Sequence, residues 1–99
     1  MINIKIHKSY RTVVAVCDTE LLGKYFEEGK RQLDLKERFY KDQEYQEAEA
    51  IQLLQNQMIE DATFNIVGPL STQAAIKAQL ISQESLSTVQ NIPFALKLI

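Results

Sequence analysis

Cysteine and histidine each occur only once among the 99 residues of the chain. A single cysteine cannot form a disulfide within the chain. The usual zinc sites are built from several Cys and His side chains, so the scarcity of these two residues also excludes the usual zinc ligand sets. We therefore expect neither a metal site nor a cofactor.

Nucleotide-binding motifs and long apolar runs are also missing. The three glycines form neither G-x-x-x-x-G-K-[ST] nor G-x-G-x-x-G, which excludes the common phosphate loops. No apolar run approaches the roughly 20 residues that a membrane-spanning helix needs. The first residues, M-I-N-I-K-I-H-K, lack the basic-then-apolar order of a secretory signal. These absences predict a complete cytoplasmic protein with no membrane segment.

The length of the chain limits its organisation. Residues 1–99 are enough for one domain and too few for two. A core of this size leaves little room for a large enclosed active site. We therefore expect a protein that is not an enzyme, and we assign no catalytic residues.

The net charge of −2 hides a segregation of charge along the chain. Residues 1–41 carry nine Lys or Arg and six Asp or Glu, whereas residues 42–61 carry six acids and no base. Because the chain is not basic overall, binding to nucleic acid would require a local basic patch.

The N-terminus predicts a β-hairpin. Residues 2–6 alternate apolar and polar side chains, which is typical of a half-buried strand. Residues 12–17, T-V-V-A-V-C, are apolar or β-branched throughout and predict a strand covered on both faces. Ser9-Tyr10 is expected to form the turn between them.

The next segment predicts a helix and a third strand. Apolar residues at helical spacing indicate a helix over residues 18–28, with Asp18 or Thr19 as its N-cap. Gly29 is suited to the left-handed position that ends a helix. Residues 31–36 alternate again and predict a strand.

The remaining chain predicts two helices and further strands. A helix is expected over residues 43–61, and residues 63–67 form either a short strand or the tail of that helix. A second helix is expected over residues 71–80, with strands at 88–92 and 94–99 on either side of Pro93. The approximate order ββαβααββ predicts an α+β fold, a small two-layer sheet-and-helix sandwich.

Four residues are candidates for a pocket: Cys17, Asp18, Gly23 and Asn65. A thiol at a helix N-terminus can be reactive, but the adjacent carboxylate of Asp18 opposes ionisation. His7 is the only histidine available as a base, is placed far from Cys17 by the hairpin and is expected to be solvated. These arguments favour Cys17 as a buried core residue. Gly23 indicates close approach of a backbone or ligand, and Asn65 either satisfies buried backbone groups or faces a pocket.

Basic and aromatic residues are interleaved in the first half of the chain. Cations for phosphates and aromatic faces for bases are what single-stranded RNA binding needs. The candidate RNA-binding or partner-binding residues are Lys30, Arg31, Arg38, Phe39, Tyr40 and Lys41. Four acids lie among them, so a solvated face of mixed charge is the alternative interpretation; they are Glu27, Glu28, Asp34 and Glu37.

Several segments resemble one archaeal family, catalogued as domain of unknown function 424 (DUF424). They are C-D-x-E-L-L-G-K-x-F-x-E-G from Cys17, F-Y at Phe39, N-I-V-G at Asn65 and P-F-A at Pro93. The resemblance covers nearly the whole chain. It implies a small archaeal cytoplasmic α+β domain of unassigned activity, and it supplies no catalytic residues. Many members have a histidine after the C-terminal proline, where this chain has Phe94.

Three functions follow, in order of preference. The first is a non-enzymatic binding module that contacts RNA or proteins associated with translation or the ribosome. The second is a protein–protein adaptor that self-associates, because the apolar segment F-A-L-K-L-I would template pairing at a sheet edge. The third is an enzyme or small-ligand protein with a pocket near Cys17 and Asp18.

Overall fold

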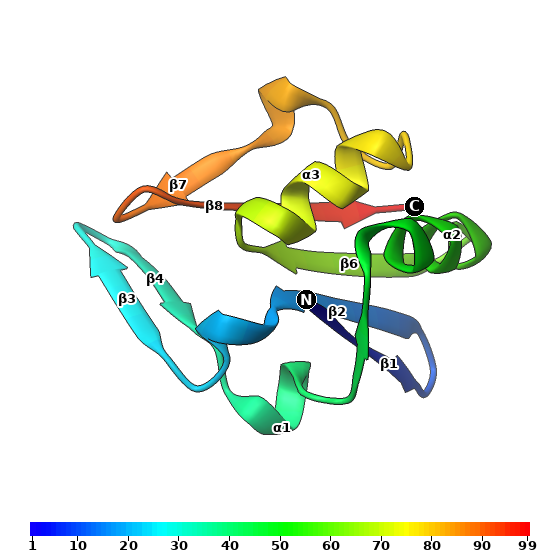
Figure 1. The fold of residues 1–99 in the computed structure, drawn as a ribbon, viewed down its shortest axis with the longest axis horizontal. Helices are drawn as coiled ribbons and strands as arrows, with labels where there is room; N and C mark the ends of the chain where they lie inside the picture. Colours follow the sequence, from blue (N-terminus) through cyan, green and yellow to red (C-terminus); the bar gives the residue numbers. More distant parts are fainter.

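A six-stranded mixed sheet forms the centre of the protein in the computed structural model, which describes all of residues 1–99 (Figure 1). Its strand order is β5-β1-β2-β6-β8-β7. The predicted N-terminal hairpin supplies β1 (Ile2–Lys8) and β2 (Thr12–Asp18), which pair antiparallel. Strand β2 also pairs in parallel with β6 (Ala62–Val67), whereas every other pairing in this sheet is antiparallel.

Helices α2 (Glu47–Asn56) and α3 (Pro69–Lys77) cover one face of this sheet (Figure 1). The first face receives Val14 and Val16 of β2, together with Phe64 of β6, all of which are fully buried. The helices contribute mainly small side chains to this core, which lets them approach the sheet closely. The buried helix residues are Ala50, Leu54, Ala74 and Ala75.

The second face is covered by a separate two-stranded hairpin, β3 (Tyr25–Glu28) and β4 (Arg31–Asp34). Two short helical turns flank it, η1 (Thr19–Leu21) and α1 (Glu37–Tyr40). A smaller core lies beneath them, and it confirms that β2 is buried on both faces. Its members are Ala15, Cys17, Leu21, Leu33, Leu35, Tyr40, Val67 and Val89.

The helix predicted over residues 18–28 is wrong. The chain makes only the turn η1 and then enters β3, so Tyr25 and Phe26 lie on a strand. Gly29 and Lys30 connect Glu28 to its partner Arg31 as a two-residue hairpin turn, with φ of +60° at Gly29. A glycine at the first turn position is a hairpin signature. The glycine that resembled a helix end therefore reverses a strand.

The helix predicted over residues 43–61 is shorter than expected. Residues Gln43–Tyr45 form the edge strand β5, and α2 ends at Asn56. The start of α2 is defined by the Glu49 carboxylate, which accepts a hydrogen bond of 3.0 Å from the Gln46 backbone N–H. Residues 63–67 belong to strand β6, which decides between the two interpretations of that segment.

The C-terminal hairpin consists of β7 (Ser87–Val89) and β8 (Ile92–Leu98), preceded by the turn η2 (Gln83–Ser85). The break predicted at Pro93 is wrong, because the turn is formed by Gln90 and Asn91, both with positive φ, and Pro93 lies inside β8. The observed order is ββββαβαβαββ, and the α+β class is confirmed. None of the helices has both the length and the apolar character needed to span a membrane.

Candidate functional site

Three residues on one face of β1 hold α1 in place. The alternation of β1 turns its isoleucines toward the helices, which leaves Asn3, Lys5 and His7 on the other face. Asn3 Oδ1 accepts a hydrogen bond of 2.8 Å from the backbone N–H of Asp42, just after α1. Lys5 Nζ donates to the Arg38 carbonyl at 2.7 Å, and His7 Nε2 donates to the Phe39 carbonyl at 2.9 Å. A four-residue helix is thereby fixed to the sheet.

An open groove of about 750 Å³ lies along this junction. Its aromatic wall is a stack of His7 on Phe39, with ring centroids 4.8 Å apart and planes 19° apart. His7, which was expected to be solvated, is therefore packed and hydrogen-bonded. The residues lining the groove are Lys5, His7, Asp34, Lys36, Arg38, Phe39 and Tyr40.

The groove carries an excess of positive charge. Lys5, Lys36 and Arg38 face one carboxylate, that of Asp34. Lys36 Nζ lies 3.7 Å from that carboxylate, and both side chains are about half exposed, at 61% and 49%. An ion pair this exposed contributes little to stability and exchanges readily with other partners. The groove is thus open to anions.

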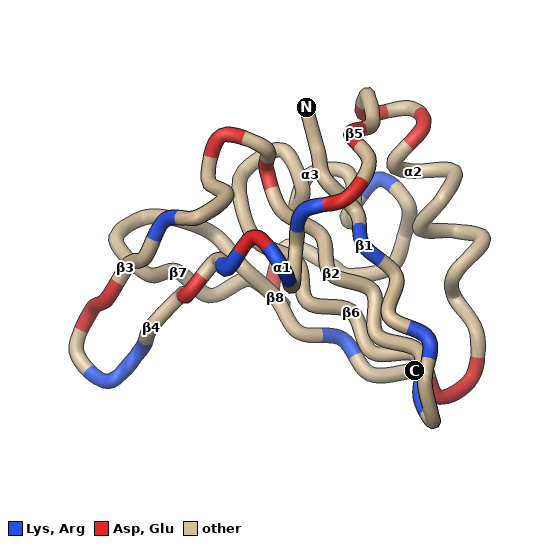
Figure 2. Tube along the Cα trace, turned by 90° about the horizontal axis from the view of Figure 1, so that it is seen from below, with Lys and Arg blue, Asp and Glu red and all other residues tan.

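The predicted basic and aromatic patch is divided between two places. Arg38, Phe39 and Lys41 lie on or beside α1, whereas Lys30 and Arg31 lie at the far tip of the β3–β4 hairpin (Figure 2). The tip is tied to the C-terminal hairpin, since Arg31 Nη1 donates to the Thr88 carbonyl at 3.3 Å. The structure does not bring the six predicted residues together as one surface.

Tyr40 is buried too deeply for a base to stack on its ring. It is only 8% exposed, and burial, followed by the charges of Cys17 and Asp34, raises its pKa to about 12. Its ring packs edge-on against Phe39, with centroids 4.9 Å apart. Tyr40 therefore supports Phe39 from below.

Sequence reasoning missed Lys5 and His7 as groove residues. The alternation of β1 places Lys5 and His7 on one face, so part of the signal is present in the sequence. The location of α1 over that face depends on contacts between residues more than 30 positions apart. Local patterns carry no information about such contacts.

A second, smaller pocket of about 260 Å³ adjoins the groove. It contains Asn65, which projects from the middle of β6 onto the open part of the sheet, beside Leu96 of β8. Asp34 and Tyr40 line both cavities, so the two are neighbours. The full lining is Gln32, Leu33, Asp34, Tyr40, Asn65, Ile66, Val67, Phe94, Ala95 and Leu96.

Cys17 is fully buried in the smaller core. Burial, and secondarily the negative charge of Asp18, raises the pKa of the thiol to about 12. His7 pairs with Val13 and Asn3 pairs with Cys17, so four strand residues, about 13 Å, separate the imidazole from the thiol along the sheet. This environment keeps Cys17 protonated and without a base, which argues against a nucleophilic role.

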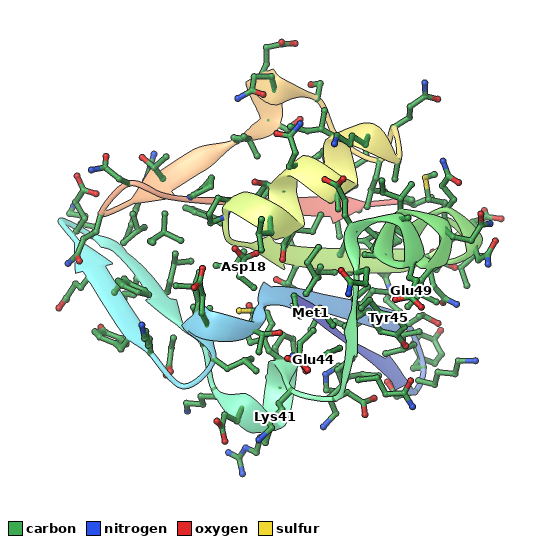
Figure 3. The ribbon with its side chains drawn as sticks, viewed as in Figure 1. Met1, Asp18, Lys41, Glu44, Tyr45 and Glu49 are labelled. Carbon is green, nitrogen blue, oxygen red and sulfur yellow. The ribbon has the colours of Figure 1, made fainter.

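Asp18 is buried at the end of β2 and points toward the start of α3 (Figure 3). Its carboxylate accepts hydrogen bonds from the backbone N–H groups of Leu70, at 3.1 Å, and Ser71, at 2.8 Å, and from Ser71 Oγ at 2.7 Å. Asp18 was predicted to cap the next helix along the chain. It instead satisfies the free N–H groups of a helix about fifty residues later.

Gly68 is required beside Asp18. Its φ of +112° is unfavourable for other residues, and a Cβ there would overlap the Asp18 carboxylate. The motifs C-D at Cys17 and N-I-V-G at Asn65 thus meet in space, although they are far apart in sequence.

The four predicted pocket residues do not line one cavity. Successive residues on a strand point to opposite faces, so Cys17 enters the smaller core and Asp18 lies against α3. Gly23 sits in a turn with φ of +80°, where its backbone N–H donates to the Leu35 carbonyl at 2.7 Å. Of the four, only Asn65 lines a pocket.

A sequence model of one protein family, described as a protein of unknown function (DUF424), matches residues 6–98. The chain belongs to the DUF424 family. No curated protein sequence matches this DUF424 chain.

One solved structure has the same fold, a crystal structure described as an uncharacterized conserved protein from Methanopyrus kandleri. The TM-score is 0.88 at 21% sequence identity, over 99% of this chain and 90% of the other. At that identity, the similarity establishes the shared fold alone.

Proposed function

We propose that this DUF424 protein is a non-enzymatic module that binds single-stranded RNA in the groove between α1 and β1. The observation that carries the proposal is the arrangement of Lys5, Lys36 and Arg38 around the stacked rings of His7 and Phe39. Cations that follow a phosphate backbone, combined with aromatic faces on which bases stack, are the usual elements of single-strand recognition.

The clamping of α1 supports the proposal. The Lys5 and His7 side chains hydrogen-bond with backbone carbonyls of α1, so the groove is formed before any ligand arrives. A preorganised site does not lose side-chain and loop freedom on binding, which favours affinity. Lys36 and Arg38 have no such structural bonds and are the residues to test.

The test is fluorescence anisotropy with a labelled oligouridine of about ten nucleotides. If two to three phosphates are neutralised, affinity falls roughly seven- to twentyfold between about 50 and 200 mM salt, as expected for a single strand. Lys36→Glu with Arg38→Glu should weaken binding and flatten this salt dependence, because both cations are reversed.

The matched control is Lys30→Glu with Arg31→Glu at the hairpin tip. It makes the same change in net charge at a different place. Equal losses in the two double variants would contradict a site in the groove. Absence of binding at low salt would overturn the proposal altogether.

In the cell, the expected partners are RNA and the translation or ribosomal proteins that accompany it, in the cytoplasm of an archaeon. The archaeal source of the structural relative supports this setting. Affinity capture with and without ribonuclease tests the partners. Recovery of ribosomal proteins that disappears with ribonuclease supports RNA contact, whereas recovery that survives indicates a protein partner.

A second candidate function is self-association through β8. Strand β7 pairs only with residues 92–94, so the C-terminal half of β8 has an open edge. Leu96 and Leu98 are also 63% and 65% exposed on the sheet face. An open strand edge with apolar neighbours is a template for pairing with another chain. A monomeric mass by light scattering at millimolar concentration would eliminate this candidate.

A further inference from the structure

Four polar side chains line the pocket beside the groove: Gln32, Asp34, Tyr40 and Asn65. The Asn65 amide and the Tyr40 hydroxyl hydrogen-bond with no other group of the chain, and neither is sealed from solvent. Asp34 has only its exposed ion pair with Lys36. Unused hydrogen-bonding groups in a concave site are available to a ligand.

The walls of the pocket are apolar and flat. Val67, Phe94 and Leu96 lie side by side on β6 and β8 and form the floor. The volume of about 260 Å³ is below the roughly 300 to 1,000 Å³ typical of drug-sized ligands. The pocket therefore has room for a small ring system such as a single nucleobase, whose apolar face suits this floor and whose edge carries polar groups.

We propose that this pocket binds a guanine base of the RNA strand held in the groove. This inference rests on the proposed function. Guanine presents two parallel donors, N1–H and the 2-amino group, which match the two oxygens of the Asp34 carboxylate. Asn65, which lines the same pocket, offers its amide N–H to the guanine oxygen O6.

The other bases fit this site less well. Adenine has an unprotonated N1 beside its amino group, which the Asp34 carboxylate would repel. Cytosine and uracil each offer one donor flanked by an acceptor, so neither can satisfy both carboxylate oxygens. The chemistry of Asp34 therefore selects guanine among the four bases.

The two cavities are close enough for one RNA strand to place its backbone in the groove and a base in the pocket. Asp34 and Tyr40 line the groove and the pocket alike. A strand whose phosphates lie at Lys36 and Arg38 therefore places a neighbouring base over the pocket. The Lys36 ammonium then moves from Asp34 to a phosphate, and the carboxylate is freed for the base.

The experiment compares labelled oligouridines that carry one central guanine, inosine or adenine. Inosine lacks only the 2-amino group. We expect the guanine oligomer to bind roughly tenfold more tightly than the adenine one, with inosine between them. Asp34→Asn should abolish the guanine preference, so that the guanine and adenine oligomers bind this variant with equal affinity.

Asn65→Ala should reduce the guanine preference as well. Glu84→Gln is the control for Asp34→Asn, because it removes one negative charge at an exposed position on η2. Equal affinity for all oligomers would overturn the inference and leave the proposed function standing. If the wild-type protein bound none of the oligomers, the proposed function itself would be overturned. Free guanosine monophosphate that binds as tightly as the guanine oligomer would also overturn the inference, because the site would then be a nucleotide site.

Discussion

The carboxylate of Asp18 lies among three donors of α3, and no solvent reaches it. Hydrogen bonds to a charged acceptor are stronger than neutral ones, and donors left buried without a partner are costly. Asp18 and Gly68 therefore form one structural unit, in which the missing Cβ of the glycine makes space for the carboxylate. This unit explains the Cys17-Asp18 motif without catalysis.

Asp18→Ala should lower the free energy of unfolding by about 2 to 4 kcal/mol, because three donors lose their acceptor. Gly68→Ala should be similarly destabilising through overlap with the carboxylate and its unfavourable φ. Urea unfolding followed by circular dichroism measures both. Ser71→Ala removes one donor only and should cost about 1 kcal/mol. Values within about 0.5 kcal/mol of wild type for Asp18→Ala would refute this role.

At the scale of elements, the β3–β4 hairpin was the least predictable part. Leu21, Leu22, Tyr25 and Phe26 occur at the spacing of a helix face, and the same residues satisfy a short turn followed by a strand. Tertiary contacts decide in favour of the strand, because Phe26 and Leu33 pair across the hairpin and pack into the smaller core on the second face of the sheet. The alternating segments of β1 and β8 were identified from their period of two, whereas residues 63–67 of β6 were left open between a strand and the tail of a helix.

The hairpin depends on Gly29 for its reversal. No atom lies near a Cβ at this position, so the cost of Gly29→Ala is conformational and amounts to about 1 to 2 kcal/mol. Gly29→Asn should cost less, because asparagine tolerates positive φ better. Urea unfolding of the two variants measures the difference. Equal stability of the alanine variant and the wild type would show that the turn relaxes to another conformation.

At the scale of the whole molecule, the site was less predictable than the fold class. The α+β class follows from composition and period alone. The groove depends on Asn3, Lys5 and His7 contacting a helix of four residues, too short for any periodic signal. The predicted patch combined residues that are close in sequence. Lys30 and Arg31 lie at the tip of the β3–β4 hairpin, so the length of the hairpin separates them from α1.

The folding equilibrium should weaken in alkaline solution. Cys17 has its pKa raised from 9.0 to about 12, and Tyr40 from 10.0 to about 12, mainly by burial. Below pH 9 both groups are protonated in the folded and unfolded chains, so their contribution to stability is complete. The unfolded chain releases its protons first, between pH 9 and 12 for Cys17 and between pH 10 and 12 for Tyr40, so stability falls in these ranges by up to about 1.4 kcal/mol per pH unit for each group.

Urea midpoints at pH 8, 9.5 and 11 check this expectation, with Cys17→Ala as the matched variant. The variant should lose less stability over that range, because one of the two groups is gone. Parallel pH profiles for the two proteins would contradict a buried, protonated thiol.

The pairing of β2 with β6 has a consequence for synthesis of the protein. During translation, Asp18 is synthesised before its hydrogen-bond donors, the first of which lies 52 residues further along the chain. At ribosomal speeds of about 5 to 20 residues per second, that interval lasts roughly 3 to 10 s. During it, the apolar strand T-V-V-A-V-C has only its first neighbour, and one edge stays unpaired. The nascent chain therefore exposes an unpaired apolar strand edge, which can pair with other chains, until Ser71 has left the ribosome.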